Sequence, residues 1–450
     1  MKTIKNIFTI KSLLIILFYQ LTANSQVIVK TQPVSLNSTS KTEAIENIVK
    51  LLNDNYVFPD KAAEMGKFIL TKLNNNEYEN INDSRAFGDQ LSKDLQSISH
   101  DKHLWVRYNP EDASEIKKNS AGSKHEEVSA EEIEMMKHEN YGFKKVERMN
   151  GNIGFIDFRG FSPSKYSKET IESVMGFLSN CDAIIIDLRQ NGGGDPTGVQ
   201  LISSYFFDSN PVHLNDLYFR PENRTDEFWT LKEIEGKRMP DVDLYILTSN
   251  YTFSAAEEFT YNLKNLKRAT IVGETTGGGA HPGDVLAVNA DFVMFVPNGN
   301  AINPITKSNW EGTGVIPDIA VSHDKALQTA KLAALEKLAQ KTSDEKIKSK
   351  LQWEAQSVKA ELNPWQADET TLKSFAGNYG ERHVTFENGE LYYQRTGRQK
   401  IKMIPFTEDQ FKFKEVDYFR LKFERDVTGN IVEIQGLFDN GQVDISKKVN

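Results

Sequence analysis

Apolar residues recur with a helical period of about 3.6 through the first part of the chain. Between Thr42 and Leu73 the pattern is interrupted at Tyr56-Val57-Phe58-Pro59, which predicts the corner between two helices. A third helix is predicted from Arg85 to Ile98. We therefore expect an N-terminal helical subdomain over residues 26–108. A polar connecting segment with one weak helix should follow at residues 109–150.

From Gly151 onward, short apolar runs alternate with segments of helical period. This alternation predicts an α/β core with a mainly parallel sheet over residues 151–323. In such sheets, sites lie at the carboxyl ends of the strands, where Gly192-Gly193-Gly194 and Ser254 occur. The predicted strands are 153–158, 183–188, 244–247 and 269–272, and the predicted helices are 168–178, 199–206 and 255–266.

The last part of the chain changes character twice. Residues 324–364 are rich in alanine, leucine, lysine and glutamate and predict a helical linker. Its second helix is expected to begin at the capping-box pattern Thr342-x-x-Glu345. Beyond Pro364, apolar and polar residues alternate between turn signals such as Glu387-Asn388-Gly389, which predicts a C-terminal antiparallel β domain at residues 365–450.

Ser254 lies where the apolar run Leu244–Leu247 gives way to the helical pattern that starts at Ala255. The first N–H groups of a helix have no intrahelical acceptor and carry a partial positive charge. A negative charge that develops beside Ser254 is therefore stabilised, which is what a nucleophilic serine needs. Serine also caps helices often, and this stretch alone leaves the capping role open.

The triple glycine at residues 192–194 indicates close approach of the backbone to another group. Neither G-x-x-x-x-G-K-[ST] nor G-x-G-x-x-G is present, which disfavours a nucleotide-binding loop. A plain turn is one interpretation. The other is that a glycine N–H and the N–H of Ala255 together form an oxyanion hole.

The N-terminus indicates export. Three lysines precede an apolar run at residues 13–19 and small residues follow it, a pattern typical of a cleaved signal peptide at residues 1–25. No other stretch approaches the ~20 apolar residues of a membrane-spanning helix. We expect a periplasmic or secreted protein with no transmembrane segment after signal cleavage.

The composition disfavours several classes of partner and cofactor. The formal net charge of −9 argues against nucleic acid as the main partner. The single cysteine, Cys181, excludes an internal disulfide and a multi-cysteine metal site. No His/Asp/Glu cluster has the sequence spacing of a metal site, so we expect no metal and no other cofactor.

Four motifs occur in order: Asp187-x-Arg189-x-Asn191-x-Gly193-Gly194, Thr252–Glu257, Gly273–Gly277 and Gly312–Asp318. They resemble the tail-specific, or C-terminal processing, serine peptidase family S41. The resemblance implies a ClpP/crotonase-like core that hydrolyses bonds in a peptide or protein substrate through an acyl-enzyme. It also implies that Ser254 is the nucleophile. Gly193 or Gly194, together with Ala255, would donate to the oxyanion.

The family has two catalytic variants. In the branch with a PDZ domain a lysine is the general base, but Gly279 occupies the matching position here. The other branch includes the tricorn core and the interphotoreceptor retinoid-binding protein repeats, and uses a histidine and a glutamate. His103 and Glu311 match those positions, and Tyr56-Val57-Phe58-Pro59 resembles the helical entry motif of that branch. Lys102 stands where the tricorn-type site has a serine, so the resemblance supports a three-residue arrangement and not a four-residue one.

The chemistry agrees with that arrangement. A neutral imidazole can take the proton of Ser254, and a carboxylate at its far nitrogen fixes the tautomer. We expect His103 to be the base and Glu311 to orient it, with activity falling as the pH drops through about 6.5. Considered singly, His100 and His281 remain alternatives to His103.

Neighbouring residues are expected to support the site. Asp187, Arg189 and Asn191 should hold the turn that presents Gly193, and His281 should line the mouth of the site. One alternative from a different class remains. The retinoid-binding repeats indicate that such a scaffold can also be a non-catalytic binder of an apolar ligand or peptide.

Overall fold

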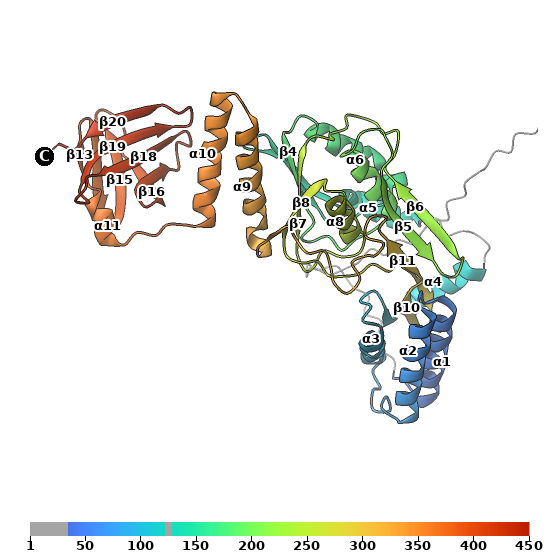
Figure 1. Cartoon of the computed structure of the whole chain (residues 1–450). Helices are drawn as coiled ribbons and strands as arrows, with labels where there is room; N and C mark the ends of the chain where they lie inside the picture. The colour runs from blue at the N-terminus through green and yellow to red at the C-terminus, as the bar shows by residue number, and fades with distance from the viewer. Residues whose placement is uncertain (1–34, 122–127, 450) are drawn as a thin grey trace, which may run out of the picture. The chain divides into compact units, whose positions relative to one another are not determined.

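The computed structural model describes residues 35–121 and 128–449, so the predicted signal peptide at residues 1–25 lies outside the described residues. The chain divides into two compact units, and Figure 1 labels many of their elements. The first comprises Met1–Glu147 and Phe155–His323, and the second comprises Arg148–Gly154 and Asp324–Asn450. Within the described ranges, no helix is long and apolar enough to cross a membrane.

Three helices open the first unit: α1 (Ser38–Asn55), α2 (Pro59–Asn74) and α3 (Ser84–Ser99). Local chemistry sets where they begin. The side chains of Asn37 and Asp83 each accept a backbone N–H of the helix that follows. Proline occupies the first position of α2, where its missing N–H costs nothing.

These helices share a core with strands from much later in the sequence. Strand β1 (Trp105–Tyr108) pairs antiparallel with β10 (Phe292–Pro297), which pairs antiparallel with β9 (Gly283–Ala287). One hydrophobic cluster joins helical residues such as Phe87 to Met294 of β10. The predicted helical subdomain is therefore packed onto the α/β core within the same unit.

A six-stranded sheet with the order β12-β8-β7-β4-β3-β2 forms the centre of the α/β core. The pairs β4/β7, β7/β8 and β8/β12 are parallel, which confirms the predicted fold class. A smaller sheet, with the order β11-β5-β6, was not predicted. The strands are β2 (Phe143–Met149), β3 (Ile153–Phe158), β4 (Ala183–Asp187), β5 (His213–Phe219), β6 (Arg224–Trp229), β7 (Asp243–Thr248), β8 (Ala269–Gly273), β11 (Gly299–Ile302) and β12 (Ile319–Ala320), and the helices are α6 (Ser164–Leu178), α7 (Pro196–Ser204) and α8 (Ala255–Asn265).

The prediction of one weak helix in the connecting segment at residues 109–150 is wrong, because two helices form there. These are α4 (Pro110–Ala121), which opens with a proline and two acidic residues, and α5 (Ala130–His138). In α5 the side chain of Ser129 accepts the N–H of Glu132, whose carboxylate accepts the N–H of Ser129. This capping box starts a helix whose apolar periodicity is weak.

The second unit contains α9 (His323–Lys341), α10 (Glu345–Leu362), α11 (Glu369–Ser374) and an eight-stranded antiparallel sheet. Phe375, Phe411 and Phe423 pack with ring centroids 4.7–5.5 Å apart in its core. The strands follow one another in sequence: β13 (Gly377–Tyr379), β14 (Arg382–Glu387), β15 (Glu390–Arg395), β16 (Ile401–Thr407), β17 (Gln410–Phe413), β18 (Phe419–Arg425), β19 (Ile431–Phe438) and β20 (Val443–Lys447).

The predicted capping box of α10 does not form. The helix begins at Glu345, and Asp344 is its N-cap, with a side chain that accepts the N–H groups of Lys346 and Ile347. Because the helix starts after Asp344, Thr342 lies outside it, and the threonine hydroxyl accepts the N–H of Asp344 at 3.2 Å instead of a helix N–H.

Candidate active site

Ser254 lies at the junction of β7, which ends at Thr248, and α8, which begins at Ala255. It has φ 55° and ψ −124°, a conformation that costs a non-glycine residue of order 1–3 kcal/mol. Its N–H donates to Oε2 of Glu257 at 3.0 Å. The N–H of Ala255 has no acceptor among the described residues. A half-buried serine therefore sits in a strained turn beside an unused helix N–H.

The glycine turn after β4 packs against this serine. A Cβ built on Gly193, which has φ 114°, would lie 2.7 Å from Cβ of Ser254, so only glycine fits. The N–H of Gly193 donates to Oδ1 of Asn191 at 2.9 Å. The N–H of Gly194, in contrast, has no acceptor in the described parts of the chain. Of the three predicted oxyanion donors, Gly194 and Ala255 have available N–H groups, and Gly193 is engaged within its own turn.

Three polar residues hold the glycine turn. The carboxylate of Asp187 accepts Nε of Arg189 at 2.8 Å and Nη2 at 2.6 Å, a bidentate pair. Asn191 donates from Nδ2 to the carbonyl of Phe158 at 3.1 Å, and its own carbonyl accepts the N–H of Phe253 at 3.1 Å. Asn191 thus links the glycine turn to the residue that precedes the serine.

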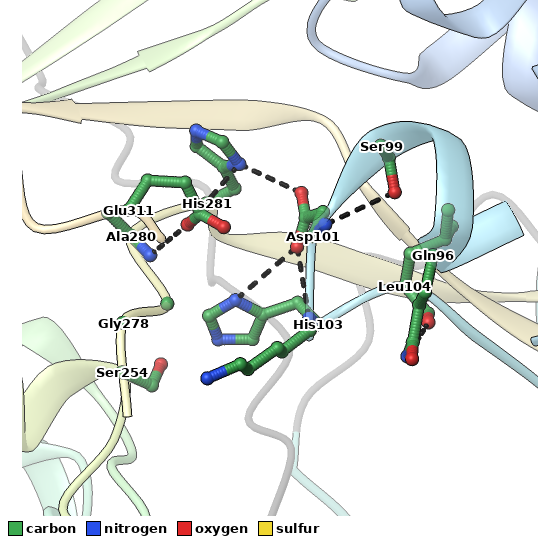
Figure 2. A network of polar contacts seen from close by, with 12 residues as sticks. Gln96, Ser99, Asp101, His103, Leu104, Ser254, Gly278, Ala280, His281 and Glu311 are labelled. Carbon is green, nitrogen blue, oxygen red and sulfur yellow. Dashed lines mark hydrogen bonds and ion pairs between the residues drawn. The ribbon is translucent and has the colours of Figure 1, made fainter. Parts of the chain in front are cut away.

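His103 reaches the same place from the end of α3. His100 takes a left-handed conformation with φ 57°, which turns the chain out of the helix. The ring of His103 is only 4% exposed and packs on the ring of Phe253, with centroids 4.5 Å apart. Because Phe253 precedes Ser254, this contact brings the imidazole to the serine side of the network in Figure 2. Neither ring nitrogen has a hydrogen-bond partner among the described residues.

Burial controls the acidity of His103. Removal of the ring from water lowers its pKa to about 4, although the charge of Asp101 opposes this. The pH at which activity is expected to fall is therefore lower than the 6.5 predicted from the sequence, because the imidazole stays neutral to a lower pH.

We expect acylation of Ser254 to keep more than about half of its neutral rate at pH 5.5, because His103 still has the lone pair that accepts a proton. Rates of labelling by a fluorophosphonate between pH 4 and 8 measure this, with circular dichroism to show that the protein stays folded. A midpoint at pH 6.5 would contradict the prediction.

Asp101 and His281 complete a buried network beside His103 (Figure 2). Oδ2 of Asp101 lies 2.8 Å from Nδ1 of His281, and Oδ1 lies 3.9 Å from Nδ1 of His103. Oε2 of Glu311 accepts the N–H of Ala280 at 2.6 Å and lies 3.5 Å from Nδ1 of His281. The structure thus brings His103 and Glu311 into one cluster. His281, predicted at the mouth, is 5% exposed and belongs to this cluster.

The network concentrates negative charge on one carboxylate. Burial and the nearby charge of Asp101 raise the pKa of Glu311 to about 7. Burial also opposes ionisation of Asp101, but the hydrogen bond from His281 and the charges of both histidines hold its pKa below the usual range. At neutral pH Asp101 is ionised, whereas Glu311 is partly protonated.

Residue 279, which matches the lysine position of the PDZ branch, has no room for a side chain. A Cβ on Gly279 would lie 2.6 Å from Cε1 of His103 and closer still to the ring of Phe253. The Nζ of Lys102 donates to the carbonyl of Gly277 at 2.5 Å. A side chain at residue 279 and the imidazole of His103 would compete for the same space.

Glu257 is a central residue of the site to which the sequence analysis gave no role. Its buried carboxylate accepts the hydroxyl of Thr276 at 2.5 Å and the N–H groups of Gly278 at 2.7 Å, Gly279 at 2.8 Å and Ser254 at 3.0 Å. Burial raises its pKa to about 7. The available signal was a glutamate three residues after a serine at a helix start, which is the capping-box spacing.

Three groups could hold a cation. Asp101, His103 and Glu311 each offer one ligand atom, and these atoms lie within 4.8 Å of one another. One imidazole and two carboxylates suit a divalent ion such as Zn²⁺. Sequence spacing did not show this cluster, because Glu311 joins it only in the fold, and the absence of a metal stays a prediction.

A cavity of about 450 Å³ opens beside Glu311 and His281. Its walls include Tyr56 and Phe58 of the predicted entry motif, and Asn309. A cavity of this size and mixed polarity can accommodate a side chain or a short peptide segment.

Parts of this chain are similar to known proteins. Residues 152–321 match the profile of peptidase family S41, and residues 26–141 match that of the N-terminal domain of peptidase S41 in eukaryotic IRBP. The tail-specific protease of Haemophilus influenzae is 30% identical over 138 residues, covering 29% of this chain and 18% of the relative. A "Probable CtpA-like serine protease" of Staphylococcus saprophyticus is 22% identical over 213 residues, covering 47% of this chain and 42% of the relative.

The chain therefore spans less than half the length of these two relatives. Among solved structures, a lipoprotein from Streptococcus agalactiae is similar with a TM-score of 0.43 and 17% identity, covering 69% of this chain and 100% of that chain.

Proposed function

This chain belongs to peptidase family S41, and from that premise we propose that it is an exported serine peptidase that hydrolyses peptide bonds through an acyl-enzyme on Ser254. One observation carries the proposal. The strained serine at the start of α8 is joined, through its neighbour Phe253, to a buried histidine whose ring nitrogens have no hydrogen-bond partner among the described residues. A nucleophile beside a neutral base at a helix N-terminus is the arrangement that acyl transfer requires.

In the proposed reaction, Oγ of Ser254 attacks the carbonyl carbon of the scissile bond while Nε2 of His103 takes the hydroxyl proton. The carbonyl oxygen becomes an oxyanion and accepts hydrogen bonds from the N–H groups of Gly194 and Ala255. The C–N bond then breaks as the imidazolium gives its proton to the leaving amine. Water, deprotonated by His103, hydrolyses the acyl-enzyme and restores the serine.

The deciding experiment is covalent labelling with a fluorophosphonate, followed by mass spectrometry of the modified peptide. We expect one label, on Ser254, which is lost in Ser254→Ala. Ser173→Ala is the matched control, because that hydroxyl is exposed on α6 and donates to the backbone carbonyl of Glu169 in its own helix. A folded protein that never labels would reject the peptidase and favour a non-catalytic binder of an apolar ligand or peptide.

Export is the part of the proposal that rests on residues 1–25. Cleavage after Ser25 is supported by the lysines of this segment, by its apolar run and by the small residues that follow the run. We expect the mature chain to begin at Gln26 and to be found outside the cytoplasm. Intact-mass measurement of the protein from cell fractions tests this, and a product that retains residues 1–25 would contradict it.

The C-terminal β domain should be dispensable for the chemistry. Every side chain assigned to the reaction lies before residue 324, and the β domain has a hydrophobic cluster of its own. Deleting residues 365–450 should leave hydrolysis of a small ester or short peptide within about tenfold, or ~1.4 kcal/mol, of the full chain. Comparison of kcat/KM for the two chains measures this, and a folded deletion without turnover would show that the domain completes the site.

A further inference from the structure

The carboxylate that lies closest to His103 is that of Asp101, two residues earlier in the chain. Asp101 is 1% exposed, and its Oδ1 accepts the backbone N–H of His103 at 3.0 Å. The same oxygen is 3.9 Å from Nδ1 of the His103 ring. Catalytic hydrogen bonds are often this long without substrate and tighten in the complex. In Glu311, by contrast, Oε2 accepts the N–H of Ala280 and lies near Nδ1 of His281, so it does not bond to the ring of His103.

Asp101 is also held in place from its other side. Its Oδ2 accepts Nδ1 of His281 at 2.8 Å and the hydroxyl of Tyr56 at 3.2 Å. Both partners are buried, at 5% and 1% exposed. With Oδ2 anchored by two donors, the carboxylate cannot turn away, and Oδ1 stays directed toward the ring of His103.

Charge favours the same carboxylate. An imidazolium that forms on His103 during the reaction is stabilised by a neighbouring group that is ionised at the working pH. Coulomb attraction weakens with distance, so the carboxylate of Asp101, whose Oδ1 lies 3.9 Å from Nδ1 of His103, stabilises that charge most.

We propose that Asp101 is the positioning carboxylate of the active site, and that it accepts the Nδ1–H of His103. Nε2 is then left unprotonated and available to Ser254. His281 and Tyr56 fix Asp101, and Glu311 fixes His281 and the backbone at Ala280. No proton passes to Asp101, because the only transfers run between Ser254, Nε2 of His103 and the leaving group. The inference rests on the proposed function and changes the residue that orients the base.

Kinetics of two isosteric variants test the assignment. We expect Asp101→Asn to lower kcat about 10³- to 10⁴-fold with little change in KM, because a triad histidine without its carboxylate adopts the wrong tautomer. The fall in kcat in Glu311→Gln should be at least about tenfold smaller than that in Asp101→Asn. Asp216→Asn is the matched control, since Asp216 is another aspartate paired with a histidine, His213 at 2.6 Å in the same unit, and takes no part in the contacts given for Asp101. A larger loss in Glu311→Gln than in Asp101→Asn would overturn the proposal.

A tautomer measurement separates positioning from a structural effect. The eight histidines are labelled with ¹⁵N, and the His103 signals are those that disappear in His103→Gln. At pH 7 the ring should carry its proton on Nδ1 in the wild type and in Glu311→Gln, and should lose that preference in a folded Asp101→Asn protein. An unchanged tautomer in Asp101→Asn rejects the inference. This measurement needs no turnover, so it holds even if the labelling experiment rejects the peptidase.

Discussion

Replacing His103 with alanine should lower kcat/KM about 10⁴- to 10⁶-fold, because triad members act as a unit and Ser254 without its base is a weak nucleophile. The ring is 4% exposed and contacts Phe253, so the melting temperature of the variant must be measured beside its activity. Adding Glu311→Ala to His103→Ala should cost little more, because the interaction it removes no longer serves a base.

Lys102→Ala is the control for this prediction. The lysine is the only residue between Asp101 and His103, but its side chain is exposed and donates to the carbonyl of Gly277. The variant should keep most of its activity. An active His103→Ala protein, together with a folded but inactive Lys102→Ala protein, would return the chain to a serine–lysine mechanism.

Gly279→Ala should lower kcat/KM by about 10²-fold or more while the protein remains folded. The added methyl group would lie 2.6 Å from Cε1 of His103 and would also overlap the ring of Phe253. The imidazole must therefore move, and a displacement of about 1 Å is enough to cost about 10²-fold in rate. Steady-state kinetics on a small ester, with the melting temperature as a fold check, measure the effect.

Gly176→Ala is the matched control for the glycine variant. Gly176 lies in α6, and a Cβ there meets nothing within 4 Å. Alanine at a compatible helical position stabilises a protein by about 0.4–1 kcal/mol, so this variant should be active and slightly more stable. Full activity in Gly279→Ala would show that the imidazole is not confined by this glycine.

Glu257 connects the two sides of the site. Its carboxylate holds the N–H of Ser254 on one side and the N–H groups of Gly278 and Gly279 on the other. The same loop continues to Ala280, whose N–H donates to Glu311. Ser254, the loop that confines His103 and the carboxylate cluster are therefore linked through one buried glutamate.

The predictions that held depended on contacts between residues close in sequence. The run of strand, serine and helix around Ser254 is local, and so is the glycine turn after β4. The one weak helix predicted at residues 109–150 failed because capping groups, and not apolar periodicity, start α4 and α5. The capping box at Thr342 failed because Asp344, two residues later, caps the helix and moves its start to Glu345.

The α/β alternation and the strand–helix junction at Ser254 were predictable from the chain alone, and so were the residue types of the candidate site, because each follows from neighbouring residues or from an ordered set of motifs. The position of Asp101 beside His103, with His281 and Tyr56 bound to its other oxygen, became visible in the folded chain and not before. The same holds for the burial that lowers the pKa of His103 to about 4. The physical reason is that desolvation and hydrogen-bond partners depend on which distant segments pack together, and local periodicity carries no information about that packing.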